Sequence, residues 1–233
     1  MNIQAIIFDC DGVLVDSEYL IMKADLAFLK DLGIAYSPED YHHKFVGRTA
    51  EENMVTLTQE IQRVSGQMFT EELAQKRAGY LQDSLKNDLL PLEGASDFIK
   101  SLDVKKAVAS NTTYTHWLSD KMKFTGLYDL FAPHIYAAEV VERGKPAPDL
   151  YLYAAARLGV APEHCLVIED SPTGATAAVA AGMHTIGFVG ASDIPDGHVE
   201  KLLTVGVQQV FSNFTDVRQY VETLQGETLK HAV

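Results

Sequence analysis

The chain has 233 residues, of which 47% are hydrophobic and 22% charged, so it is long and apolar enough for one large globular domain or two smaller ones. Its formal net charge of −13 argues against a protein that grips nucleic acid through the phosphate backbone, because such binding needs clustered Lys and Arg. Its apolar runs fall short of the roughly 18 residues of a membrane span, and Asp9 and Asp11 interrupt the first of them, so we expect neither a membrane span nor a secretory signal.

The chain begins with a short apolar run, residues 3–8, which predicts a buried central strand of a parallel sheet. The following block, residues 17–88, predicts helices and no strand. Apolar residues recur at helical spacing from Ser17 to Leu32, and helix-start signals follow at Ser37-Pro38 and at Thr49. An all-helical block directly after a first strand indicates an insertion into the domain to which that strand belongs.

Beyond residue 89 the pattern changes to strands that alternate with helices. The strand-like runs are residues 104–110, 134–138, 165–170, 184–189 and 208–212. The helix patterns are residues 95–102, a segment from Thr113, and residues 148–158, 172–181, 197–204 and 215–225, with a frayed tail from Gly226. Such alternation predicts βαβ units and a parallel sheet covered on both faces. We therefore predict a Rossmann-like, doubly wound α/β core domain of residues 1–16 and 89–233, with an inserted α-helical cap domain of residues 17–88.

Polar residues stand where four of the predicted strands end. They are Asp9 and Asp11 after the first strand, Ser110 and Asn111 at the end of the second, Lys145 after the third, and Glu169 and Asp170 at the end of the fourth. Ligands of open α/β sheets bind at the carboxyl ends of the strands, so these side chains predict a site at that edge. Each also has a plainer interpretation, as a turn residue, a helix-start acid or an exposed loop lysine.

The chemistry of such an edge follows from its charge. Two carboxylates about 4 Å apart repel by on the order of 4 kcal/mol at an effective dielectric constant of about 20. A cation relieves this repulsion, and oxygen ligands favour a hard ion, Mg²⁺ above all. One carboxylate can then act as a nucleophile and another as a general acid and base, while Lys145 and the Ser110 hydroxyl hold phosphate oxygens. Phosphoryl transfer requires this set of groups.

Four segments carry a resemblance to a known family. They are DCDGVLVDSE, SNTT, GKPAPDLY and IEDSPTGATAA, and in order and spacing they resemble the four motifs of the haloacid dehalogenase-like hydrolase superfamily. The resemblance extends to about Val189 and depends on the four segments together, since DxD alone is a weak signal. The helical insertion resembles the cap of the subfamily that includes sugar-phosphate phosphatases and β-phosphoglucomutase.

The resemblance implies a role for each site residue. Asp9 would be the nucleophile that forms an aspartyl-phosphate, and Asp11 the general acid and base. The phosphate would be bound by Ser110, with Asn111 beside it, and by Lys145, which would also orient the nucleophile. Mg²⁺ would be held by Asp9, Asp170 and the backbone carbonyl of Asp11, with Glu169 as a further or water-mediated ligand.

These roles predict a Mg²⁺-dependent phosphatase that acts on a small phosphorylated metabolite, most simply a sugar phosphate. In β-phosphoglucomutase the cap begins Asp-Thr-x-x-x-His, whereas Ile21 takes the place of that His here, which favours hydrolysis over a phosphomutase reaction. A dehalogenase would not need the full acidic set. A receiver-type signalling module, the alternative of another class, has its phosphorylated Asp after a later strand and carries no cap.

Three further expectations concern a substrate contact in the cap, the cellular compartment and the binding partners. Arg48, between two cap helices, is a candidate for the distal part of the substrate, with a solvated loop residue as the alternative. Two cysteines, Cys10 and Cys165, make no disulfide framework in a chain of this length and favour the cytoplasm. We expect a small phosphate ester as the partner, without nucleic acid or membrane, and the sequence does not indicate an oligomeric state.

Overall fold

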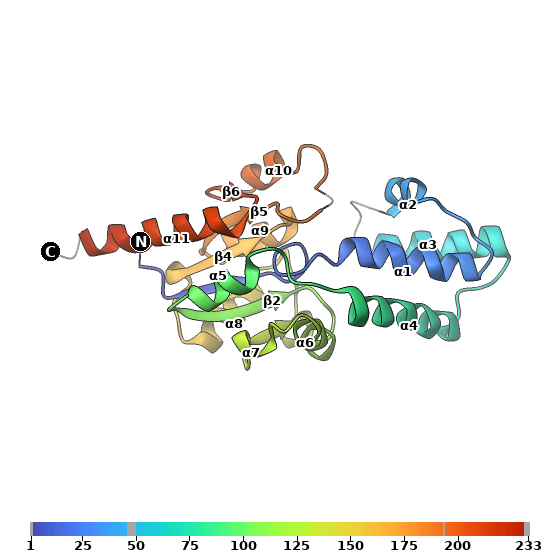
Figure 1. Ribbon diagram of the computed structural model, residues 1–233, viewed down its shortest axis with the longest axis horizontal. Coiled ribbons are helices and arrows are strands. Elements are labelled where there is room, and N and C mark those ends of the chain that lie inside the picture. The colour runs from blue at the N-terminus through green and yellow to red at the C-terminus, as the bar shows by residue number, and fades with distance from the viewer. Residues whose placement is uncertain (1, 46–49, 193, 231–233) are drawn as a thin grey trace. The chain divides into compact units, whose positions relative to one another are not determined.

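The structure is a computed structural model that describes residues 2–45, 50–192 and 194–230. The chain forms two compact units (Figure 1). The first consists of Met1–Asp16 and Leu90–Val233, and the second of Ser17–Leu89. The first is an α/β unit and the second an all-helical one, so the predicted fold class is confirmed.

The described part of the α/β unit contains a six-stranded sheet in the order β3-β2-β1-β4-β5-β6. Its strands are β1 Ala5–Phe8, β2 Lys105–Ser110, β3 Ile135–Ala137, β4 Cys165–Glu169, β5 His184–Phe188 and β6 Val210–Phe211. All neighbouring strands run parallel, and β1 lies between β2 and β4, with Phe8 opposite Val108 and Ile168. The chain extends the sheet to one side of β1 and then returns to the other, which creates a topological switch point beside β1.

Helices cover both faces of this sheet (Figure 1). They are α5 Ala95–Ser101, α6 Thr115–Phe124, α7 Tyr128–Phe131, α8 Asp149–Leu158, α9 Pro172–Ala180, α10 His198–Thr204 and α11 Phe214–Lys230. Short 3₁₀ turns, η1 Ala138–Val140 and η2 Pro162–His164, complete the connections. The last helix continues to Lys230, so the frayed tail that we predicted from Gly226 is wrong for residues 226–230.

The two faces of β1 enter two different cores, because side chains alternate along a strand. Ile7 packs in a cluster with Leu150 of α8 and Ala177 of α9. Phe8 points to the opposite face, where its ring contacts those of Phe98 and Phe131 at centroid distances of 6.1 and 5.5 Å. All four residues of β1 are buried, as a central parallel strand requires.

The helical unit contains α1 Glu18–Asp31, α2 Pro38–Phe45, α3 Ala50–Ser65 and α4 Glu71–Asp88. Its core is an apolar cluster of Phe28, Leu29, Ile34, Tyr41, Phe45, Leu57 and Ile61. Two carboxylates, Asp25 of α1 and Glu60 of α3, are buried among the described residues of this unit. Asp25 accepts hydrogen bonds from the Tyr41 hydroxyl and from the Arg77 guanidinium.

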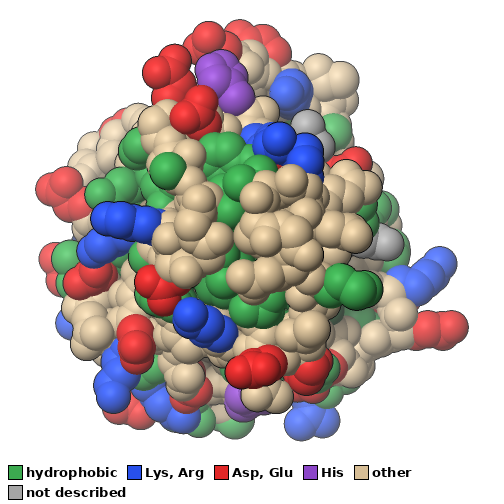
Figure 2. Space-filling model, turned by 90° about the vertical axis from the view of Figure 1, so that its right-hand side faces the viewer, with side chains coloured by type: hydrophobic (Ala, Val, Ile, Leu, Met, Phe, Trp, Pro, Cys, Tyr) green, Lys and Arg blue, Asp and Glu red, His purple; other side chains and the backbone are tan. Residues whose placement is uncertain are grey.

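Within the described ranges, no helix has the length and apolar character that crossing a membrane requires. Figure 2 shows a face of the molecule on which acidic and basic side chains are interspersed among polar and hydrophobic ones. Such a mixture is typical of a surface in contact with water.

Candidate active site

The loop after β1 presents the first two aspartates. The backbone N–H of Asp9 still donates to Ile168 of β4 at 3.0 Å, so the sheet fixes the start of the loop. The chain then turns tightly, with Gly12 N–H donating to the Val15 carbonyl at 2.8 Å. Gly12 has a φ of +79°, and a Cβ there would collide with the Asp170 carboxylate. The turn therefore needs glycine, and Asp170 of the β4 loop lies directly against it.

A second connection joins the loops after β2 and β3. The side-chain amide of Asn111 donates to the Lys145 carbonyl at 2.9 Å, and the Lys145 backbone N–H donates back to Asn111 Oδ1 at 2.8 Å. Ser110 is buried at the end of β2, and its hydroxyl oxygen accepts the Thr112 N–H at 3.1 Å. Asn111 thus fixes the backbone from which Lys145 extends, which is a positioning role beside the expected phosphate site.

Lys145 lies between two carboxylates. Its ammonium group donates to Asp9 Oδ1 and, at 2.6 Å, to Glu169 Oε1, and only 3% of its side chain is exposed. The ammonium nitrogen also lies 4.6 Å from the centre of the Tyr151 ring. Burial alone would lower the pKa of Lys145, but the charges of Asp9 and Glu169 outweigh it and raise that pKa above its usual value, which favours the charged ammonium form.

Glu169 is fully buried, and protein donors occupy both of its oxygens. Oε1 accepts from Lys145 and from the Tyr151 hydroxyl at 2.9 Å, and Oε2 accepts from the Ser171 N–H and hydroxyl at 2.9 and 3.0 Å. Ser171 in turn caps α9 by accepting the Gly174 N–H at 3.0 Å. A direct bond from Glu169 to a metal would therefore replace one of these four hydrogen bonds.

The negative charges of Asp9 and Asp170 are balanced less completely by protein donors than that of Glu169. Burial is the main cause that raises the pKa of Asp9 to about 7, with Lys145 acting against it and Glu169 and Asp11 adding to it. Burial also raises the pKa of Asp170 well above its usual value, and the charges of Glu169 and Asp9 add to this effect. In the described ion pairs, Lys145 contacts Asp9 and Glu169 but not Asp170. The contact of His198 Nε2 with Asp170, at 2.6 Å, is to the backbone carbonyl oxygen and not to the side-chain carboxylate.

The oxygen atoms at this edge of the sheet are suitable ligands for a hard cation, although the side chains that could supply them are few. No group of three or more His, Cys, Asp or Glu side chains in the described residues is arranged to hold a metal ion by side chains alone. The carboxylates of Asp9 and Asp170 both have raised pKa values, however, and a cation beside them would lower the cost of ionising them. Carboxylate and backbone carbonyl oxygens are the ligands that Mg²⁺ accepts, with water completing its shell.

Asp11 pairs with a residue that sequence reasoning missed. Lys121 of α6 places its ammonium nitrogen 2.6 Å from Asp11 Oδ1 and 2.8 Å from Oδ2. Burial would lower the pKa of Lys121, but the charge of Asp11 leads the opposing causes and the pKa lies above its usual value. In the sequence, Lys121 looks like an ordinary surface lysine of an amphipathic helix. It belongs to none of the four motifs, so sequence reasoning had no signal by which to select it.

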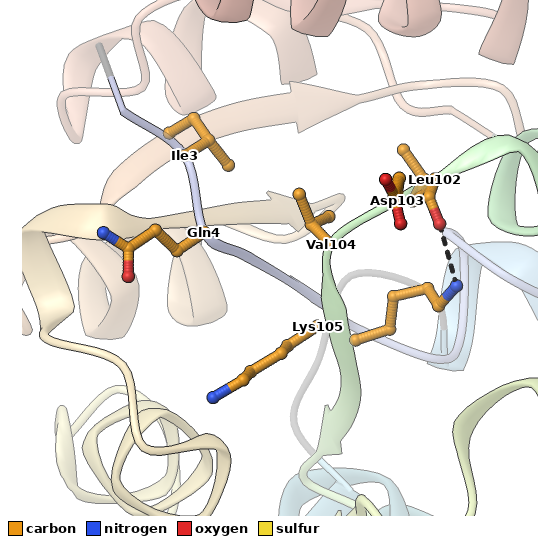
Figure 3. A pocket seen from close by; sticks show the side chains of 7 residues that line it. Ile3, Gln4, Leu102, Asp103, Val104 and Lys105 are labelled. Atoms are coloured by element: carbon orange, nitrogen blue, oxygen red, sulfur yellow. Dashed lines mark hydrogen bonds between the residues drawn. The ribbon is translucent and has the colours of Figure 1, made fainter.

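The remaining candidate from the sequence, Arg48, lies outside the described residues. A hollow of about 590 Å³ lies elsewhere, at the amino ends of β1 and β2 (Figure 3). Its lining residues are Ile3, Gln4, Leu102, Asp103, Val104, Lys105 and Lys106. Its two lysines donate to backbone carbonyls, Lys105 to Leu158 at 2.6 Å and Lys106 to Leu102 at 3.2 Å.

Comparison with known proteins gives consistent matches. The family model of haloacid dehalogenase-like hydrolases matches residues 3–182. The chain is 32% identical to the phosphorylated carbohydrates phosphatase of Thermotoga maritima over 184 residues, 78% of this chain and 83% of that protein. It is 28% identical to the 6-phosphogluconate phosphatase of Escherichia coli over 187 residues, 80% and 83% of the two chains. The solved structure of a haloacid dehalogenase-like protein from Agrobacterium tumefaciens is similar with a TM-score of 0.78 and 32% identity, covering 95% of this chain and 99% of that one.

Proposed function

This chain belongs to the haloacid dehalogenase-like hydrolase family and is a phosphoric monoester hydrolase, and we propose that it hydrolyses a small phosphorylated metabolite, a sugar phosphate, by way of an aspartyl-phosphate on Asp9. The observation that carries the proposal is the contact of Lys145 with Asp9 and Glu169 at the carboxyl edge of the sheet. The charge of Lys145 lowers the cost of ionising Asp9, whose pKa burial still raises to about 7, and it attracts a phosphate dianion.

The first half of the reaction is an exchange of one P–O bond for another. A carboxylate oxygen of Asp9 attacks phosphorus, and the bond from phosphorus to the ester oxygen breaks. Asp11, in its acid form, gives its proton to the departing oxygen, so that an alcohol leaves. Lys145 balances charge on Asp9 and the phosphoryl group, and the Ser110 hydroxyl at the end of β2 binds a phosphoryl oxygen.

The second half restores the enzyme. Asp11, now a carboxylate, takes a proton from a water molecule while the water oxygen attacks phosphorus. The bond to Asp9 breaks, and inorganic phosphate and the free carboxylate result. Asp9, Asp170 and the Asp11 carbonyl would hold Mg²⁺, with Glu169 as a water-mediated ligand, and when bound the ion supplies positive charge to the phosphoryl group.

Two features support the substrate class and the compartment. The relatives named above are phosphatases of phosphorylated carbohydrates and of 6-phosphogluconate, and we extend the class, not either compound, to this chain. The two cysteines, Cys10 and Cys165, are free and buried, which suits a reducing cytoplasm.

The test is a panel of phosphorylated metabolites ranked by kcat/KM with and without Mg²⁺, because discrimination between substrates lies in that ratio. We expect phosphate release from several sugar phosphates, with a preference for one subset, and loss of release in excess chelator. Full activity in chelator would contradict the metal requirement, and an absence of turnover on every ester would contradict the proposed function.

A further inference from the structure

We propose that Lys121 is a positioning residue for catalysis that holds the carboxylate of Asp11 in the orientation its acid–base role needs. The inference rests on the proposed function, because it assigns a partner to the group that protonates the leaving oxygen. Its structural basis is the pair of contacts, 2.6 and 2.8 Å, from one ammonium nitrogen to both oxygens of Asp11.

Contact with both oxygens constrains the carboxylate more than a single hydrogen bond does. An ammonium group that lies between the two oxygens fixes the plane of the carboxylate and opposes rotation about its Cβ–Cγ bond. Asp11 stands in a tight turn after β1, and 29% of its side chain is exposed. Lys121 therefore restrains this carboxylate from a separate helix, α6, at both of its oxygens.

The location of Lys121 makes this restraint stable. It lies on α6, a helix anchored by the buried side chains of Leu118 and Met122. Only 13% of the Lys121 side chain is exposed, although its charge is kept. Lysine side chains lose much rotational freedom when they are buried, and such a cost is offset here by a charge-assisted contact to a site residue.

The two lysines of the site then have different tasks. Lys145 pairs with Asp9 and Glu169, so it serves the nucleophile. In the described ion pairs, the partner of Lys121 is Asp11. An error of about 1 Å in the placement of a reacting group can reduce a rate on the order of 10²-fold, so loss of this orientation has a measurable effect.

The chain provides a matched control on the same helix. Lys123 is two residues from Lys121, but 54% of its side chain is exposed and it pairs with Asp120 of its own helix at 3.2 Å. Lys123→Met thus makes the same chemical change at a lysine that pairs with a carboxylate outside the site.

The experiment compares kcat/KM for two kinds of substrate. A hexose 6-phosphate has an alkyl leaving group that needs a proton, whereas p-nitrophenyl phosphate has a leaving group that departs as an anion. The value of kcat/KM reports the steps up to loss of the leaving group, and in those steps Asp11 is the proton donor. For Lys121→Met we expect a loss of about 10- to 100-fold on the hexose phosphate and less than about threefold on the aryl ester.

Three further measurements separate positioning from other roles. Lys121→Arg should recover much of the activity, because the guanidinium fork also contacts both oxygens of a carboxylate. In an Asp11→Asn background, Lys121→Met should add no further loss on the hexose phosphate, since both changes remove the same function. Inhibition by inorganic phosphate should be unchanged, and Lys123→Met should behave as the parent chain does.

Several results would overturn the inference. Equal losses on both esters, or weaker inhibition by phosphate, would make Lys121 a phosphate-binding or structural residue. Unchanged kinetics would make it a bystander. These outcomes are distinct from failure of the proposed function, in which the parent chain itself releases no phosphate from either ester, and Lys121 then has no acid–base step to serve.

Discussion

Four carboxylates at the edge of the sheet, Asp9, Asp11, Glu169 and Asp170, face two lysines that pair with three of them. When all four are ionised, these two lysines balance two of the four negative charges. The protein relieves part of this surplus by holding protons, since burial raises the pKa of Asp9 to about 7 and that of Asp170 well above its usual value. A divalent cation would remove the rest, which is the physical reason to expect Mg²⁺ at this site.

The two leading aspartates should respond differently to the same substitution. Asp9→Asn should abolish turnover, because an amide oxygen is a poor nucleophile. Asp11→Asn should lower kcat by about 10²–10⁴-fold through the loss of proton transfer, yet leave the nucleophile intact. With p-nitrophenyl phosphate, whose leaving group needs no proton, Asp11→Asn should therefore accumulate phosphate on Asp9, and mass spectrometry of the quenched protein measures it.

The matching control is the double variant with Asp9→Asn and Asp11→Asn, which should take up no phosphate. Phosphate found on any residue other than Asp9 would contradict the assignment of the nucleophile.

Among the elements, α1 and α4 of the helical unit are joined by three ion pairs in the described residues, and two of these differ in burial. Asp25 of α1 is buried and accepts two hydrogen bonds from Arg77 of α4, at 2.6 and 2.9 Å. Lys23 of α1 and Asp88 of α4 also pair, at 2.7 Å, but both side chains are largely exposed. Burial, not distance, distinguishes the two pairs.

We expect Arg77→Met to destabilise the helical unit by about 3 kcal/mol, because it leaves the buried Asp25 carboxylate without its cation. Lys23→Met, which breaks the exposed pair between the same two helices, should leave stability unchanged within error. Urea unfolding followed by circular dichroism measures both. Equal effects of the two substitutions would show that the buried pair has no special role.

The elements were largely predictable, because strand and helix periods are local. The apolar run at residues 3–8 and the run at 165–170 became β1 and β4 with small changes at their ends. The end of α11 was missed since Gly226 resembles a helix stop, although the helix continues through it. Lys121 could not be identified, because its contact joins residues 110 positions apart and depends on how α6 packs against the sheet.

For the whole molecule, the acidic site makes stability depend on pH. An unfolded aspartate titrates at about 3.9, whereas Asp9 in the fold titrates at about 7. Between these values the folded chain holds a proton that the unfolded chain releases, so this group lowers stability as pH rises, until the cost is complete above about pH 7. A cation that binds the ionised form should recover this loss.

We therefore expect Mg²⁺ to raise Tm more at pH 8 than at pH 5.5, because protons compete with the metal for the carboxylates. At a concentration of about 100 times Kd the stabilisation is about 2.7 kcal/mol, or roughly 5–10 °C in a chain of this size. Differential scanning calorimetry at matched ionic strength measures it, with Asp170→Asn as the control that should lose the effect. An equal rise at both pH values would mean that Mg²⁺ binds elsewhere.

The choice between hydrolysis and a phosphomutase reaction also concerns the whole molecule, since both use the same α/β unit. A mutase must protect its aspartyl-phosphate from water until a second hydroxyl arrives, and in β-phosphoglucomutase a His at the start of the cap helps to couple acid–base chemistry to cap closure. Ile21, in the first turn of α1, stands at that position, and an aliphatic side chain neither carries a proton nor makes a hydrogen bond.

Without that coupling, water should reach the aspartyl-phosphate as soon as the alcohol departs. We therefore expect β-glucose 1-phosphate and a set of hexose phosphates to yield inorganic phosphate with no requirement for a bisphosphate activator. Free phosphate and the ratio of isomers, followed in the same reaction, decide the question. Isomerisation faster than phosphate release would place the chain among the mutases. If the chain is a phosphatase, Ile21→His should slow phosphate release, because it restores the group that delays attack by water.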